Sequence, residues 1–233
     1  MRQIFWLDWK KLASSLFLSM LVLLILSYLI EFFEFDRLLA DQFYQLQGNR
    51  WAFKDFWITE TVIHKGGKYL SIAGALVVLI AWMFSSHISV LHQWQKRLRF
   101  LFVATVLGTI VVSFGKIVSH ISCPWDFSRY GGTLEYISLS NQLLVRNGSQ
   151  CFPAGHASAG YAWIALYFVG LYSRSVWRWL AFSIPFLIGL LFGFSQQLRG
   201  AHFISHDLWT FGICWMVSLT CYHFMLKPYE PYR

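Results

Sequence analysis

Three segments that lie far apart in the sequence carry residue types suited to phosphoryl transfer. They run from Lys116 to Pro124, from Pro153 to His156 and from Arg199 to Asp207. Lysine and arginine bind phosphate oxygens, and histidine, whose charge changes near neutral pH, serves as a nucleophile or as an acid. Each segment adjoins a hydrophobic stretch, where ionisable residues are costly and indicate a functional site. Together the segments predict a phosphate-handling site at a membrane face.

The elements that must position these segments are membrane-spanning helices. The chain has 233 residues, of which 57% are hydrophobic and 13% charged, and its apolar blocks approach the length of about 20 residues that crosses a bilayer. We predict an all-α fold, an integral membrane bundle of six transmembrane helices over residues 12–31, 67–86, 100–120, 156–173, 179–197 and 207–226. The fourth and fifth blocks are shorter, so an alternative makes one of them a buried or re-entrant helix. One domain accounts for residues 1–233, with a motif-bearing core over 100–226.

The distribution of basic residues predicts the orientation of this bundle. With six spans, one side of the membrane receives Arg2, Lys10, Lys11, Lys96, Arg97, Arg99, Arg174, Arg178, Lys227 and Arg233. An excess of lysine and arginine marks the cytoplasmic side, so both termini are expected in the cytoplasm. The net charge of +8 then follows mostly from topology, and no clustered basic soluble face indicates nucleic-acid binding. The three motif segments all fall at the opposite, outer face.

The stretch between the first two expected spans, residues 32–66, is rich in aromatic residues, which favour the headgroup level. Apolar residues at helical spacing from Leu38 to Leu46 indicate either a short helix in the membrane plane or a plain connecting loop. The basic run that follows contains Lys65 and Lys68, which either hold a helix end or contact a lipid headgroup. We interpret single histidines near span ends as interfacial side chains, namely His64, His87, His92, His120 and His223.

Two of the four cysteines fall in the long outer segment, residues 121–155. In an oxidising compartment Cys123 and Cys151 are expected to form a disulfide at the base of this segment, and two free thiols are the alternative. Cys214 and Cys221 are interpreted as small apolar residues on the last span.

The motifs resemble those of the type 2 phosphatidic acid phosphatase superfamily, which includes membrane lipid phosphatases, soluble bacterial acid phosphatases and vanadium haloperoxidases. Its motifs are K-x6-R-P, P-S-G-H and S-R-x5-H-x3-D. Lys116 with Cys123-Pro124 matches the first motif except for the arginine, and Pro153-Ala154-Gly155-His156 matches the second except for the serine. Ser195-Gln196 with His202 matches the third except for its arginine. The resemblance covers the last four expected spans, a little over half of the chain.

The resemblance implies a role for each matching residue. His202 is expected to attack phosphorus, and His156 is expected to protonate the leaving oxygen. Lys116 and the backbone around Ala154 and Gly155 are expected to bind the phosphate, because a helix that begins there would present free N–H groups and a positive dipole end.

Neighbouring residues are expected to compensate where the sequence departs from the motifs. Arg199, one helical turn after Gln196, would supply the guanidinium that the third motif lacks, and Arg129 would supply that of the first. The family acid that orients the nucleophile falls on His206, with Asp207 next in sequence. Either Asp207 or His206 therefore orients the nucleophile. The alternative register makes His206 itself the nucleophile, but it loses the G-x-H match at His202.

The function that the resemblance implies is metal-independent dephosphorylation of a lipid phosphate or diphosphate through a phosphohistidine. No cofactor and no metal are expected, since no zinc signature such as H-E-x-x-H accompanies His202, His206 and Asp207. The expected substrate is a phospholipid, polyprenyl or lipid A phosphate at the periplasmic face of a bacterial inner membrane, and no obligate protein partner is evident. The alternatives are a lipid-headgroup binder or transporter without catalysis, and a phosphotransferase that passes the phosphoryl group to another lipid.

Overall fold

The computed structural model describes residues 2–226, with side chains from Trp9 onward, and contains no β-strand among these residues. The long helices are α1 (Arg2–Phe32), α3 (Gly67–Phe84), α5 (Gln95–Ser119), α9 (Arg178–Leu198) and α10 (Ile204–Met225). The short ones are α2 (Phe35–Leu46), α4 (Ser89–His92), α6 (Leu139–Val145), α7 (Ser158–Tyr161) and α8 (Ala165–Tyr172). A π-helix, η1 (Ile58–Gly66), leads into α3, and single 3-10 turns form η2 (Pro124–Asp126), η3 (Ser128–Tyr130) and η4 (Ala162–Ile164). The predicted all-α fold is confirmed.

Within residues 2–226, five helices are long and apolar enough to cross a membrane, which indicates an integral membrane protein: Trp9–Phe32, Ile58–Phe84, Gln95–Asp126, Arg178–Leu198 and Ile204–Met225. The remaining expected span, 156–173, is a shorter apolar helix, Ser158–Tyr172, assembled from α7, η4 and α8. At 1.5 Å per residue this helix is about 22 Å long, less than the roughly 30 Å of a bilayer core. It packs among α3, α5, α9 and α10. This placement fits a helix that is surrounded by other helices and not by lipid.

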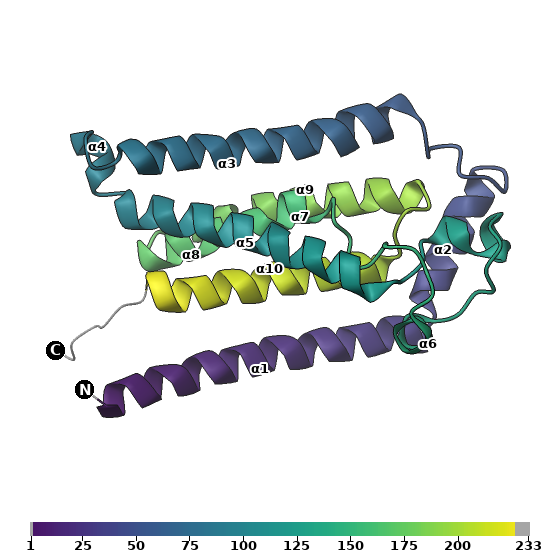
Figure 1. Cartoon of the computed structure of the whole chain (residues 1–233), viewed down its shortest axis with the longest axis horizontal. Helices are drawn as coiled ribbons and strands as arrows, with labels where there is room; N and C mark the ends of the chain where they lie inside the picture. The colour runs from purple at the N-terminus through teal and green to yellow at the C-terminus, as the bar shows by residue number, and fades with distance from the viewer. Residues whose placement is uncertain (1, 227–233) are drawn as a thin grey trace.

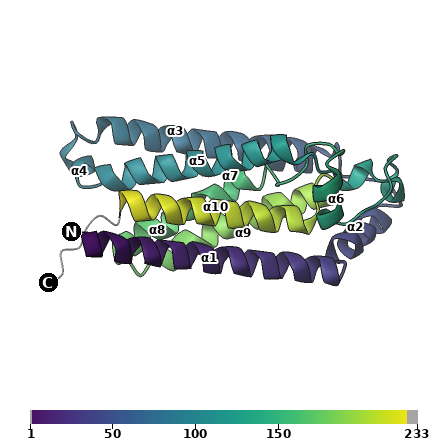
Figure 2. The same cartoon turned by 60° about the horizontal axis from the view of Figure 1, so that its bottom comes forward.

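The turns of the bundle sort into two ends. The start of α1 and the end of α10 lie at one end together with α4 and the α8–α9 turn, while α2 and α6 gather at the other (Figure 1). The view turned by 60° shows the same division (Figure 2). The first end carries Lys10, Lys96 and Arg174, whereas Lys227 and Arg233, which the expected orientation also used, lie outside the described residues. All motif segments belong to the second end.

Small residues let the helix Ser158–Tyr172 approach its neighbours closely. A Cβ added at Gly160 would lie 2.4 Å from the backbone nitrogen of Gly189, so α7 and α9 are in backbone contact. Helices in lipid associate through van der Waals packing, and small residues mark their tightest crossings. Large buried side chains fill the surrounding core, among them Phe100, Val112, Tyr161, Ile164 and Phe168. This packing fixes the turn before α7, which carries His156.

The outer helices α1 and α3 expose most of their apolar side chains and are joined to the core by indole hydrogen bonds. Nε1 of Trp209 on α10 donates to Oγ of Ser27 on α1 at 3.1 Å. Nε1 of Trp163 donates to Oγ of Ser71 on α3 at 2.9 Å. Such interhelical hydrogen bonds add to packing where water is absent.

Residues Phe35–Leu46 form α2, so the helical alternative for this segment is confirmed. The helix lies across the end of the bundle (Figure 1). Its buried Asp36 accepts hydrogen bonds from the backbone N–H of Ser205 at 3.0 Å and from the Ser205 hydroxyl at 2.6 Å. Because the first N–H groups of a helix have no partner within it, Asp36 caps α10 and fixes the chain just after His202.

Asp36→Asn is expected to raise thermal stability at neutral pH. Burial, partly offset by the Ser205 hydrogen bonds, raises the pKa of Asp36 from 3.8 to about 6, so folding favours the protonated carboxyl. A raised folded pKa contributes stability that is fully present below the unfolded value and is lost as the pH rises through the folded value. Asparagine keeps an oxygen for the Ser205 amide and cannot ionise. The thermal midpoint in detergent should therefore fall between about pH 4 and about pH 7 in the parent protein and stay flatter in the variant.

The matched control for this prediction is Asp41→Asn on the same helix. Burial acts on Asp41 too, but its hydrogen bonds and ion pair with Arg129 lower the pKa overall. Removing that charge is expected to lower the midpoint at pH 8 rather than raise it. Equal pH slopes in Asp36→Asn and the parent protein would contradict the assignment.

The segment between α5 and α7 is closed by a disulfide between Cys123 and Cys151, whose Cα atoms are 5.3 Å apart. The amide of Cys151 donates to the carbonyl of Ile121 at 2.9 Å, which holds the two ends of the segment side by side. Cys214 and Cys221 are free and buried. The bridge fixes the chain just before Pro153, where the second motif begins.

Candidate active site

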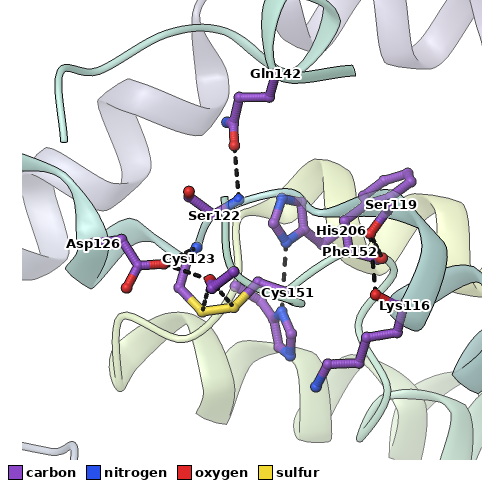
Figure 3. Close-up of a disulfide and its surroundings, with 11 residues drawn as sticks. Lys116, Ser119, Ser122, Cys123, Asp126, Gln142, Cys151, Phe152 and His206 are labelled. Carbon is purple, nitrogen blue, oxygen red and sulfur yellow. Dashed lines mark hydrogen bonds between the residues drawn. A yellow bond between two sulfur atoms is a disulfide. The ribbon is translucent and has the colours of Figure 1, made fainter. Parts of the chain in front are cut away.

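The three motif segments meet at the end of the bundle that carries α2 and α6. Lys116 lies in the last turn of α5, His156 in the turn before α7, and His202 between α9 and α10. A Cβ added at Gly155 would be 3.9 Å from Nζ of Lys116, so the ammonium lies against the second motif. In Figure 3 the Lys116 side chain extends from α5 back toward the disulfide-closed segment. Its charge also acts on the rings of both His156 and His202.

The His202 ring is held by a second histidine and by a backbone carbonyl. Its Nδ1 lies 3.4 Å from Nδ1 of His206, a contact that the dashed line from the His206 ring marks in Figure 3. The Cys151 backbone forms a hydrogen bond with the His202 ring and another with the His206 ring. Burial, together with the charges of His206, Lys116 and His156, holds the pKa of His202 well below its usual range. When Nδ1 of the neutral His202 ring carries the proton, Nε2 is the nucleophilic atom.

Asp207 lies in the first turn of α10 and is bonded elsewhere. Its Oδ2 accepts a hydrogen bond from Nε2 of Gln197 at 2.5 Å, and within the described chain its buried Oδ1 has no hydrogen-bond partner. The carboxyl packs on Gly193 of α9, where an added Cβ would lie 2.5 Å from it. Of the two residues that the sequence offered for orienting His202, His206 is the one whose ring faces it.

His156 lies in a turn and not in the first turn of a long helix. Regular helix begins at Ser158, two residues later than expected, and α7 has four residues. The Ser158 hydroxyl donates to the Gly155 carbonyl at 2.6 Å, so it braces the turn. Burial lowers the pKa of His156 to about 3, and nearby positive charges contribute, namely those of His64, Lys116, Arg199 and Lys68.

The Arg199 guanidinium lies at the site and makes three contacts with other protein groups. Its Nε donates to the Lys54 carbonyl at 2.7 Å, Nη1 donates to Oε1 of Gln196 at 3.2 Å, and Nη2 forms an ion pair with Glu60. The side chain is 9% exposed, and its charge acts on the ring of His156. A guanidinium has five N–H donors, so these contacts leave donors for a phosphate.

The other expected phosphate and headgroup ligands are placed differently. Arg129 forms a bidentate ion pair with Asp41 of α2, with two N–O distances of 2.6 Å, and this pairing raises the pKa of Arg129. Its guanidinium is thus directed to α2 and not to the motif histidines. Lys65 pairs with Glu60 at 3.2 Å and is 55% exposed, whereas Lys68 is exposed on α3 and its charge acts on His156.

His64 is a site residue that sequence reasoning missed. Its interpretation as an interfacial side chain did not anticipate this contact: its ring centroid lies 3.6 Å from that of His156. Nδ1 of His64 lies 3.1 Å from Oε2 of Glu60. The spacing of four residues between Glu60 and His64 puts their side chains on one helical face. This spacing is the feature of the sequence that could have indicated their pairing.

A cluster of possible metal ligands lies beside the site. Cys123, Asp126 and Cys151 have ligand atoms close enough to hold an ion, but the two sulfurs form the disulfide. The Asp126 carboxylate accepts hydrogen bonds from the Cys123 amide at 2.8 Å and from the Ser149 hydroxyl at 2.5 Å. The cluster is a structural support of the outer segment.

Comparison with protein-family models matches residues 97–230 to the PAP2 superfamily. The comparisons with curated proteins and with solved structures found no match. The matched region runs from α5 to the end of α10 and contains the three motif segments, while α1, α2, η1 and α3 precede it. Since the match covers more than half of the chain and its motif histidines meet at one end of the bundle, the chain belongs to the PAP2 superfamily.

Proposed function

We propose that the protein is an integral membrane phosphatase that removes phosphate from a lipid phosphate or diphosphate. Membership of the PAP2 superfamily supports phosphatase activity on a phosphate ester, and the five span-length helices support a lipid substrate. The observation that carries the proposal is the convergence of His156, His202 and Lys116. One ammonium acts on both rings, which is the arrangement that an anionic phosphate between them requires.

In the proposed reaction Nε2 of His202 attacks phosphorus opposite the lipid oxygen. The N–P bond forms as the P–O bond breaks, and His156 gives its proton to the departing oxygen. Water then attacks the phosphohistidine and passes a proton to His156. The N–P bond breaks, inorganic phosphate leaves, and both rings return to their starting states. His206 and the Cys151 carbonyl orient His202 throughout.

The phosphoryl oxygens are held in this proposal by Lys116, Arg199 and the Gly155 amide. Charge spreads over these oxygens in the transition state, so fixed donors aimed at them lower the barrier. The Ala154 amide donates to the His206 carbonyl at 3.3 Å, so it serves the fold and Gly155 provides the motif's backbone donor.

A phosphate-release assay over a lipid panel tests this function. Detergent-purified protein is given phosphatidic acid, phosphatidylglycerol phosphate, a polyprenyl diphosphate and lipid A, with a chelator present. We expect release from at least one lipid, and a loss of at least about 10³-fold in His202→Ala because the nucleophile is gone. His120→Asn is the matched control, since His120 is exposed and has a left-handed backbone that asparagine accepts.

The same assay separates the alternatives. Lipid binding without phosphate release would indicate a headgroup binder or transporter. Phosphate that appears on a second lipid instead of in solution would indicate a phosphotransferase. Either outcome would overturn hydrolysis.

We also propose that the end of the bundle with the motif segments faces the periplasm of a bacterial inner membrane. The opposite end carries an excess of basic over acidic residues, the pattern of a cytoplasmic side, whereas the end with the motif segments carries nearly all the acids beside its basic residues. In intact cells an impermeant thiol reagent should label Asn147→Cys and should not label Lys96→Cys. The reverse labelling pattern would invert the orientation.

A further inference from the structure

A pair of side chains from outside the PAP2 match lies against the motif residues. Glu60 and His64 belong to η1, which precedes residue 97, where the match begins. Oε2 of Glu60 lies 3.1 Å from Nδ1 of His64 and forms the ion pair with Nη2 of Arg199. The ring of His64 packs in turn on that of His156, with centroids 3.6 Å apart and planes tilted by 55°. One carboxylate thus connects Arg199 with the ring beside His156.

The local fold explains how η1 reaches this place. It is a π-helix of nine residues, a rare conformation that is frequent at functional sites. It continues into α3, whose first residue, Gly67, packs on Phe192 of α9, where an added Cβ would lie 2.4 Å from the ring. This close approach puts η1 beside the end of α9 that carries Arg199. The backbone here is therefore shaped to present Glu60 and His64 to the site.

We propose that Glu60 and His64 are positioning residues of the phosphatase site: Glu60 holds Arg199 and His64, and His64 holds the ring of His156. The inference rests on the proposed function, in which His156 is the acid. A carboxylate that accepts from Nδ1–H of an imidazole fixes the tautomer and the orientation of the ring. Glu60 is 23% and His64 20% exposed, so limited water competes with their contact.

The orientation of the His156 ring depends on its contact with His64. Among the described residues its ring has no hydrogen-bonding side chain, so packing on His64 is what restrains its rotation. The charged groups that face the ring are His64 from η1, Lys68 from α3, Lys116 from α5 and Arg199 after α9. A misplacement of a reacting group by about 1 Å costs up to about 10²-fold in rate. The ring of His64 therefore bears directly on turnover.

Kinetics of the full-length protein in detergent test the proposal. His64→Ala is expected to lower kcat by about 10–100-fold, with KM changed by less than about threefold, since the acid is displaced and the phosphate ligands remain. His64→Phe keeps a ring against His156 but loses the contact with Glu60, so it should recover part of the loss, which a residue needed only for its charge would not allow. In a His156→Ala background His64→Ala should cost nothing further. Multiplied losses in the double variant, or a rise in KM equal to the fall in kcat, would overturn the proposal.

A second measurement does not depend on activity. Carbethoxylation of His156 at neutral pH, mapped by mass spectrometry, should be at least about threefold faster in His64→Ala because the covering ring is removed. His120→Asn is the control and should leave the rate unchanged. An unchanged rate in His64→Ala would overturn the contact itself. A parent protein that releases no phosphate but shows the faster labelling would overturn the proposed function and leave the contact intact.

Discussion

His156→Ala is expected to lower the turnover of a lipid phosphate by about 10²–10⁴-fold, because the departing lipid oxygen loses its general acid. A phenolate leaves without protonation far more readily than an alkoxide does. The loss should therefore be much smaller on a nitrophenyl phosphate ester with an apolar tail. The measurement is kcat on both substrates, with thermal unfolding as the check on folding.

His202→Ala is the control for this leaving-group test. The nucleophile is needed whatever the leaving group, so its loss should be severe on both esters. Equal losses on the two esters in His156→Ala would mean that His156 is not the acid. They would contradict the proposed proton transfer from His156 to the leaving oxygen.

The pH dependence provides a second check on His156. In the structure burial and neighbouring cations lower the pKa of His156 to about 3, so the ring is neutral at pH 7. A phosphate anion beside the ring favours the protonated form and raises this pKa. Because kcat/KM reports the free enzyme and kcat the substrate complex, both should decline as the pH rises, and kcat should persist to the higher pH. Coincident profiles would contradict this account.

Arg199→Lys is expected to lower turnover by about 10²–10³-fold, the usual effect of losing one transition-state donor. The planar guanidinium contacts Glu60, Gln196 and the Lys54 carbonyl at once and still has donors to spare. A single ammonium on a flexible stem cannot reproduce that arrangement. The measurement is kcat/KM, with thermal unfolding to separate lost chemistry from lost structure.

Arg129→Lys is the matched comparison, because it makes the same change in a guanidinium that is bound to Asp41. Its effect on turnover should be small. Gln196→Arg, which restores the motif residue, should partly recover activity in the Arg199→Lys background. A small effect at Arg199 with a large one at Arg129 would assign phosphate binding to Arg129.

Much of the fold could be predicted from hydropathy, because lipid imposes helices of a minimum length. The five long spans were predicted in this way, and amphipathic spacing pointed to α2. The helix Ser158–Tyr172 was the hard case. Its apolar composition is that of a membrane span, but its close contact between Gly160 and Gly189 puts it inside the bundle. Hydropathy measures composition and does not distinguish lipid from protein as the surroundings.

The candidate site was less predictable, because pairing between distant side chains decides where a charge points. Motif spacing identified Lys116, His156 and His202, which the structure brings together. It could not show that Arg129 pairs with Asp41. Nor could it show that Glu60, from a segment without any motif, holds both Arg199 and His64.

The Cys123–Cys151 disulfide can form only after the chain has been synthesised. A chain newly released from the ribosome carries two thiols at these positions, and the Cys151 backbone that bonds the rings of His202 and His206 is not yet stapled. The closed segment therefore forms only when these two thiols are oxidised after synthesis. A chain kept in a reducing compartment has every motif residue and lacks the closed segment that supports them. Expression host and purification buffer thus select between two chemically different forms of one sequence.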